Sequence, residues 1–319
     1  MTRFFAALLL VGVAAATGPA WAADTFLRMV SGPAGGNWYP LGAKLMEIVG
    51  TGLDQVVTSN APGGGGANVQ DINRGDAEIG FSYGHTVFRA FSGVDRSGKE
   101  HPNLRFVATL YPAALQTAVP ADSDIQSYFD LQDRNISPGK ARWSGFEAME
   151  LLLSYYGFGV DDVRANGGTV HHVSYSDSVA LMRDGHIDAF TGLTSVPQAS
   201  FIDLNFSVGI RFLPVEDDVR TRFLAENPGY VESVIPQDAY EDQSGDVPTV
   251  GATTVLIVNK DVPEEVVYGV TRLLWERHAD LAAVSPTWKN ARREDALQTA
   301  IIPLHPGAER YYTEHGLLP

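Results

Sequence analysis

Short apolar segments alternate with amphipathic segments along almost the whole chain, and this alternation restricts the fold more than any other feature of the sequence. The runs 25–31 and 56–58 are predicted strands, each followed by a glycine-containing loop and a helical pattern, and 77–81 is a third predicted strand. Repeated units of strand, loop and helix favour an α/β sheet with parallel pairing. We find no low-complexity linker and no internal repeat. The pattern therefore predicts two compact lobes joined by crossing segments.

The same alternation continues toward the C-terminal end. A helix over 39–50 has Pro40 in its first turn, where the missing N–H costs nothing. Further helices are predicted through Val69 and Ile72 and at 146–156, 177–184 and 264–283. Further strands are predicted at 104–110, 134–137, 169–174, 189–191 and 250–258, and a less regular stretch rich in Pro, Asp and Gln follows 211–214.

The first 22 residues have the layout of a secretory signal peptide. Arg3 provides a basic start, residues 4–13 are apolar, and the segment ends in Ala20, Trp21 and Ala22. This is the arrangement that signal peptidase recognises, and we expect cleavage after Ala22. An uncleaved anchor is the alternative, but the apolar run is shorter than the roughly 20 residues that span a bilayer. We therefore expect export to the periplasm.

Composition excludes several classes of protein. The formal net charge of −15 argues against a nucleic-acid-binding protein, which needs a basic surface. The chain has no cysteine, so it has neither a disulfide nor a lipid-modified cysteine. Its length suggests two domains. We expect a monomer.

The loop 32–40 follows the first predicted strand and has the sequence GPAGGNWYP. Ligands of open α/β sheets bind beyond the carboxyl ends of strands, where loops lead into helices. Glycines let backbone N–H groups approach a ligand, while Trp38 and Tyr39 offer apolar faces with polar ends. A plain glycine turn with two core aromatics explains the same residues equally well.

A run of four glycines at 63–66 precedes the second helix. It lacks the Gly-Lys-Ser/Thr ending of a P-loop and the spacing of a dinucleotide fingerprint, so a nucleotide site is not expected. We interpret the run as a flexible turn before a helix and Asn68 as a structural residue rather than a ligand-binding one.

Two more loops carry polar side chains. The segment 81–85 (FSYGH) ends the third predicted strand, and 139–146 (GKARWSGF) precedes a helix. Ser144 is a plausible helix cap, and Arg142 is able to hold a carboxylate by two parallel hydrogen bonds. A solvated surface arginine is the alternative for Arg142.

Motifs for catalysis or metal binding are lacking. The sequence has no HExxH, GxSxG or CxxC motif, and neighbouring residues such as His171 and His172 point to opposite faces of a strand. We therefore expect no cofactor, no metal and no enzymatic activity. A secreted hydrolase that uses Ser144 or His85 remains the rival hypothesis, because a triad is recognised only in space.

Five motifs, in order, resemble the TAXI family of solute-binding proteins, which serve TRAP transporters. They are GGNWYPLG (35–42), GDAEIGF (75–81), LMRDGHIDAF (181–190), DVPTV (246–250) and IPLHPGAERYY (302–312).

This resemblance implies a type II periplasmic-binding-protein fold, in which two α/β lobes close on a ligand. It places lobe 1 at 24–113 plus 216–319 and lobe 2 at 114–215. It also implies delivery of a carboxylated solute, such as glutamate or a 2-oxo or dicarboxylic acid, to a TRAP permease driven by an ion gradient. A sensor or an ABC permease is the alternative partner. His305 and Arg310 lie in the last motif, where we expect contacts within the fold or with the permease.

Several loops depart from the family pattern. The segment RWSGF at 142–146 stands where the family has a loop of the PGSGT type, Trp38 replaces a tyrosine, and Tyr83 and His85 replace a Gln and an Asp. The segment TGLTSVPQ (191–198) matches a turn that lines the family's cleft. We propose that N–H groups at Gly36 and Gly145, together with Arg142, hold a carboxylate. The predicted ligand-binding set is Gly36, Asn37, Trp38, Tyr39, Gly65, Ser82, Tyr83, His85, Arg142, Trp143, Ser144, Gly145, Phe146, Thr191, Gly192, Thr194 and Gln198.

Overall fold

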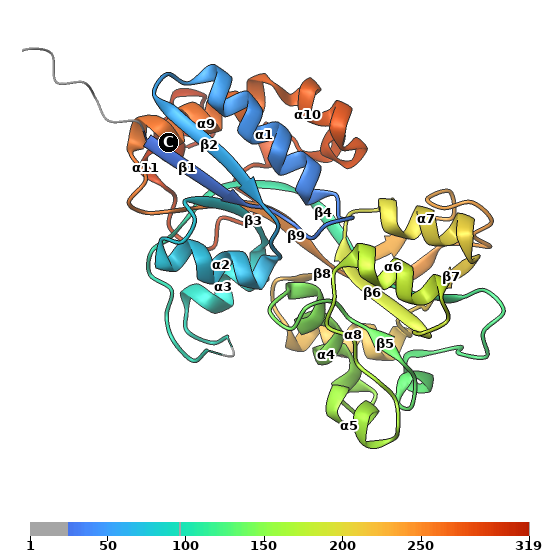
Figure 1. The fold of residues 1–319 in the computed structure, drawn as a ribbon. Helices are drawn as coiled ribbons and strands as arrows, with labels where there is room; N and C mark the ends of the chain where they lie inside the picture. The colour runs from blue at the N-terminus through green and yellow to red at the C-terminus, as the bar shows by residue number, and fades with distance from the viewer. Residues whose placement is uncertain (1–24, 96, 319) are drawn as a thin grey trace, which may run out of the picture.

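The structure is a computed structural model that describes residues 25–95 and 97–318 (Figure 1). The predicted signal peptide, 1–22, lies outside the described residues. Nine strands form one sheet with the order β2-β1-β3-β9-β4-β6-β5, in which β7 also pairs with β4 and β8 with β9. No helix in the described part is long and apolar enough to cross a membrane.

The N-terminal strand and helix units build the first half of the molecule. The strand β1 (Thr25–Val30) pairs in parallel with β2 (Val56–Ala61) and β3 (Ile79–Tyr83). The helices that follow these strands are α1 (Trp38–Gly52), α2 (Gly65–Arg74) and α3 (Gly84–Phe91). In α1, the apolar stripe that includes Leu41, Leu45 and Val49 is fully buried, as the four-residue spacing predicts.

Two long strands connect the halves. The antiparallel pair β4 (Leu104–Pro120) and β9 (Val247–Asn259) runs from one half of the molecule to the other (Figure 1). Register shifts interrupt their pairing between Phe106 and Pro112. These two strands are the crossing segments that the sequence predicts.

The second half contains shorter elements around β6. The strand β6 pairs in parallel with β5 and antiparallel with β4. The elements of the second half are η1 (Tyr128–Leu131), β5 (Ile136–Ser137), α4 (Ser144–Tyr155), α5 (Val160–Ala165), α6 (Tyr175–Arg183), β6 (Ala189–Thr194), α7 (Ala199–Ser207), β7 (Ile210–Phe212), α8 (Asp217–Glu226) and β8 (Tyr230–Ile235).

The C-terminal segment returns to the first half. His305 caps α11 by accepting a hydrogen bond from the Gly307 N–H, and Arg310 forms ion pairs with Glu264 (2.8 Å) and Glu265 (2.7 Å). Both residues therefore hold the fold together, one of the two roles expected for them. The elements are α9 (Glu264–Glu276), α10 (His278–Val284), η2 (Pro286–Asn290), η3 (Arg293–Asp295) and α11 (Pro306–Glu314).

Most predicted elements are present, but two predictions are wrong. The segment 169–174 is not a strand and makes only an isolated bridge, Ile136 to Val170, because Ser174 already caps the helix that begins at Tyr175. The predicted helix 264–283 is two helices, which are separated at Arg277. The predicted strand 104–110 continues to Pro120, and the sheet is mixed, since β9 runs antiparallel to both neighbours.

The two ends of α8 are hydrogen-bonded to the end of α4. The Tyr155 hydroxyl at the end of α4 donates to Glu226 (2.7 Å) and accepts from Asn227 (2.8 Å), and Tyr156 donates to Glu216. The segment from Glu216 to Asn227 thus contacts residues of the predicted lobe 2, although the predicted boundary assigns it to lobe 1.

Candidate ligand-binding site

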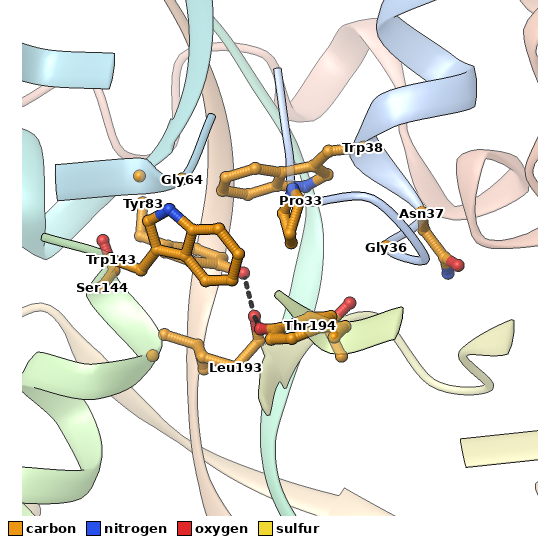
Figure 2. Close-up of a pocket in the computed structure, with 13 residues that line it drawn as sticks. Pro33, Gly36, Asn37, Trp38, Gly64, Tyr83, Trp143, Ser144, Leu193 and Thr194 are labelled. Atoms are coloured by element: carbon orange, nitrogen blue, oxygen red, sulfur yellow. Dashed lines mark hydrogen bonds between the residues drawn. The ribbon is translucent and has the colours of Figure 1, made fainter. Parts of the chain in front are cut away.

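Four helices begin around one small cavity between the two halves of the sheet (Figure 2). Trp38, Gly65, Ser144 and Tyr175 are the first residues of α1, α2, α4 and α6. The free volume, measured for the centre of a water-sized sphere, is about 20 Å³. The lining residues are Pro33, Gly36, Asn37, Trp38, Gly64, Gly65, Tyr83, Trp143, Ser144, Gly145, Tyr175, Leu193 and Thr194.

Aromatic rings from both halves form the walls of the cavity. Trp38 and Tyr83 come from the first half, with ring centroids 4.7 Å apart, and Trp143 and Tyr175 come from the second half, with centroids 5.6 Å apart. Burial raises the pKa of the Tyr83 hydroxyl well above its usual value, so it stays protonated and acts as a donor. It donates to the Leu193 carbonyl at 2.5 Å and joins the two halves directly (Figure 2).

The start of α4 supplies the polar part of the lining. Trp143 is the N-cap residue, and its side chain makes no capping hydrogen bond. The prediction that Ser144 is the cap is wrong because Ser144 already lies within the helix, where its hydroxyl bonds to the Thr86 hydroxyl at 2.9 Å. Uncapped N–H groups at a helix start carry partial positive charge and favour an anion. Since α2 also begins at the cavity, both halves direct a helix N-terminus toward it.

No lysine, arginine, histidine or carboxylate side chain lines the cavity among the described residues. Arg142 lies outside it, with its side chain 54% exposed. Its guanidinium pairs with Asp71 at 3.2 Å and donates to the Gln70 side chain at 3.1 Å, and both partners belong to α2 of the first half. Arg142 therefore bridges the two halves at the surface.

The family model that describes NMT1-like proteins matches residues 29–316. The chain belongs to the NMT1-like family. This match does not address the narrower resemblance to the TAXI family, which stays a prediction.

Solved structures show the fold of this NMT1-like chain. An alkanesulfonate-binding protein of Xanthomonas axonopodis pv. citri superposes with a TM-score of 0.51 at 14% identity, over 93% of this chain and 96% of that chain. A protein of Bordetella bronchiseptica RB50 superposes with a TM-score of 0.54 at 16% identity, over 92% of this chain and 90% of that chain. At such identities the likeness concerns the fold alone. The expected type II-like periplasmic-binding-protein fold is confirmed.

In the NMT1-like chain, nine of the predicted site residues meet at the cavity. They are Gly36, Asn37, Trp38, Gly65, Tyr83, Trp143, Ser144, Gly145 and Thr194. The N–H of Gly36 is not directed at a ligand, however, because it donates to the Pro33 carbonyl at 2.9 Å. The prediction that the Gly36 N–H holds a carboxylate is therefore wrong, and the same role for the Gly145 N–H stays a prediction.

The predicted residues Asn37 and Gln198 form hydrogen bonds that join the loop 32–40 of the first half to the second half. Asn37 donates to the Pro197 carbonyl at 3.1 Å and to the Ser195 hydroxyl. Gln198 caps α7 and donates to the Gly35 carbonyl, which also accepts from the Ser200 hydroxyl at 3.0 Å. These bonds join the two halves beside the cavity. Gln198 itself does not line the cavity but holds Gly35, which lies next to the lining residue Gly36.

Five more predicted residues lie away from the cavity. Tyr39 is partly exposed on α1. Ser82 is buried and donates to the Gly65 carbonyl at 3.1 Å, and Phe146 lies in the core. The Thr191 hydroxyl bonds to the Thr117 hydroxyl at 2.9 Å, while Gly192 makes room for the Tyr175 ring.

His85 faces a different groove, which Arg89 and Tyr230 also line. Its ring stacks on Tyr230 with centroids 3.9 Å apart, and its Nε2 bonds to the Thr86 hydroxyl at 3.1 Å. Burial lowers the pKa of His85 from 6.5 to about 3. His85 and Ser144 both bond to Thr86 but not to each other, and Nδ1 of His85 has no partner among the described residues. This arrangement is not a nucleophile–base–acid triad.

The sequence did not identify four lining residues, Pro33, Gly64, Tyr175 and Leu193. A signal for Tyr175 was present, because Ser174 followed three residues later by Asp177 is a capping-box pattern that places a helix start at Tyr175. Leu193 lies in the segment 191–198 that the family resemblance places at the cleft, but no pattern marks its main-chain carbonyl as the contact.

Replacing Arg142 with alanine is expected to weaken ligand binding about fivefold at most. An exposed ion pair stabilises by about 0.2–1 kcal/mol, and here the pair joins the two halves of the molecule outside the cavity. Asp71→Ala should have a similar effect, and both effects should shrink between 50 and 500 mM salt. Calorimetric titration measures these changes, with Arg164→Ala as the control, since Arg164 pairs with Asp161 within one half. A larger loss of affinity for Arg142→Ala that Asp71→Ala does not reproduce would mean that Arg142 contacts the ligand directly.

Proposed function

We propose that this chain is an exported solute-binding protein that captures a small organic molecule by closing its two lobes. The cavity supports this function best, because its walls come from both halves and the hydrogen bond from Tyr83 to Leu193 joins them across it. A ligand that contacts both walls binds the closed arrangement better than the open one, and so drives closure.

The lining suggests the chemistry of the solute. We propose a small carboxylated molecule whose carboxylate lies at the start of α4, near the Gly145 N–H and the Ser144 hydroxyl, while Trp38 and Tyr83 cover its apolar part. Because no cationic side chain lines the cavity among the described residues, a second carboxylate would lack a partner. We therefore rank monocarboxylates with an apolar body ahead of glutamate and dicarboxylic acids. The alkanesulfonate-binding structural neighbour adds sulfonates to the compounds worth testing.

The lobe boundaries belong to this proposal. The hydrogen bonds of Glu216, Glu226 and Asn227 with the end of α4 favour moving α8 from lobe 1 into lobe 2. We propose β4 and β9 as the segments about which the two lobes move.

We propose that the loaded protein delivers its solute in the periplasm to a TRAP permease, as the TAXI-like motifs suggest. Uptake by cells that express this chain with its permease would then stop when an ionophore abolishes the ion gradient. Uptake that persists without the ion gradient but stops when cellular ATP is depleted would indicate an ABC permease. If the cells take up no solute at all, a sensor would be favoured.

A thermal-shift screen tests solute binding. Organic acids, amino acids and sulfonates are added separately, and a ligand at 100 times its Kd should stabilise the folded state by about 2.7 kcal/mol, which raises the Tm by several degrees. Trp38→Phe should reduce the shift because Trp38 lines the cavity, whereas the control Trp275→Phe, on α9 away from the lining, should not. Turnover of esters or amides by the wild-type protein would instead support a hydrolase.

A further inference from the structure

The glycine run at 63–66 lies directly against the segment that precedes α4 in the other half. A Cβ atom placed on Gly64 would lie 2.1 Å from Cδ1 of Trp143, and one on Gly65 would lie 2.4 Å from Oγ of Ser144. A Cβ atom on Gly66 would lie 2.7 Å from the carbonyl oxygen of Arg142. Three consecutive glycines thus face three consecutive residues across the junction between the halves, so close that a Cβ atom on any of them would force a neighbouring group to move.

The glycine run is held in place and is not a loose turn. Asn68 accepts a hydrogen bond from the Gly64 N–H at 2.9 Å, and the Gly63 N–H donates to the Gly32 carbonyl at 3.0 Å. Gly64 itself has φ 179° and ψ 142°, an extended conformation that any residue adopts. The reason for glycine at this position is therefore the close approach of Trp143 and not the backbone conformation.

Trp143 is enclosed on several sides. Gly64 lies against its pyrrole edge, and a Cβ atom on Gly139 would lie 3.1 Å from Cε3. Tyr175 contacts the ring edge-on, with an interplanar angle of 89°, and Trp143 is only 7% exposed. Figure 2 shows the rest of the indole facing the cavity opposite Trp38.

We infer that Trp143 sets the size of the bound solute and that Gly64 is the seat that admits its indole when the lobes close. This inference rests on the proposed solute-binding function and names a size limit for the same site. With the indole seated, the free volume of about 20 Å³ is little more than one water molecule needs, so we expect only a short organic acid to enter between Trp143 and Trp38. A smaller side chain at 143 leaves space for a longer one.

The size limit is tested with unbranched monocarboxylates from acetate to octanoate, whose affinities are measured by calorimetry for the wild type, Trp143→Phe and Trp143→Ala. The wild type should prefer the short acids. Trp143→Ala should prefer acids that are several methylenes longer, gaining about fourfold in affinity for each added methylene that the enlarged cavity buries. Trp143→Phe should shift the preference less, and it keeps the test valid where the alanine variant fails to fold.

The seat is tested with a double-mutant cycle on the acid that binds the wild type best. Gly64→Ala should weaken binding at least tenfold in the wild type, because the new methyl group displaces the indole. The same change in the Trp143→Ala background should alter binding less than threefold, since the clash is gone. Gly245→Ala, which places a Cβ atom in open space, is the matched control and should leave binding unchanged.

The outcomes separate the two claims. If no compound of the screen or of the acid series binds the wild type, the proposed function is overturned. If acids bind the wild type but Gly64→Ala has the same effect with and without the indole, or if the Trp143 variants keep the wild-type length preference, the inference alone is overturned.

Discussion

Asn68→Leu is expected to lower the free energy of unfolding by about 3 kcal/mol or more. Asn68 is fully buried, and its side-chain amide donates to the carbonyls of Val30 (3.1 Å), Ser31 (2.7 Å) and Phe81 (2.7 Å). Its oxygen accepts from the Gly64 N–H. Leucine has nearly the same shape but neither donates nor accepts, so it leaves several buried backbone groups without partners. Urea unfolding followed by circular dichroism measures the difference.

The control for this change is Asn290→Leu, at an exposed position on η2. It should alter the free energy of unfolding by no more than about 0.5 kcal/mol. If Asn68→Leu is equally mild, Asn68 does not hold β1, β3 and the glycine run together. Asn68→Leu should also weaken solute binding, because Asn68 positions Gly64, against which the Trp143 indole packs.

The pH dependence of stability should contain a large contribution from His85. Its pKa in the folded protein is about 3, against 6.5 for an exposed histidine, because burial disfavours the imidazolium. Between pH 6.5 and 3 the unfolded chain therefore binds a proton that the folded chain does not. Stability falls as the pH drops through this window, by about 1.4 kcal/mol per pH unit.

This contribution is isolated by comparing the wild type with His85→Gln at pH 7 and pH 4.5. The wild type should lose about 2–3 kcal/mol more than the variant over that interval, whatever the neutral-pH stability of the variant. His186→Gln, at an exposed position, is the control and should follow the wild type. Equal losses in the wild type and His85→Gln would mean that His85 takes up a proton without unfolding.

The sequence was informative where a local pattern determines the structure. The strand and helix alternation predicted the α/β fold, and Asn68 is structural as predicted. The flexible turn predicted for the glycine run is wrong, because hydrogen bonds hold Gly63 and Gly64 and the next two glycines already belong to α2. Trp38, Tyr83 and Trp143 were identified because aromatic residues followed predicted strands or preceded helices, and all three line the cavity.

The sequence was less informative where function depends on distant partners. Arg142 has the right chemistry for a carboxylate, but only the folded chain places Asp71 beside it. The third strand ends at Tyr83, two residues later than predicted, and α3 starts at once, so His85 faces another groove. The apolar pattern of a strand does not mark its last residue. The contact of Gly64 with Trp143 joins residues 79 positions apart, and no local pattern encodes it.

The most direct measurement is a crystal structure of the protein with the organic acid that raises its Tm most. We predict that the acid lies between Trp38 and Trp143, with its carboxylate at the Gly145 N–H and the two lobes closed. Density for the acid in the groove beside His85, or on the outer surface with this cavity unchanged, would contradict the central claim.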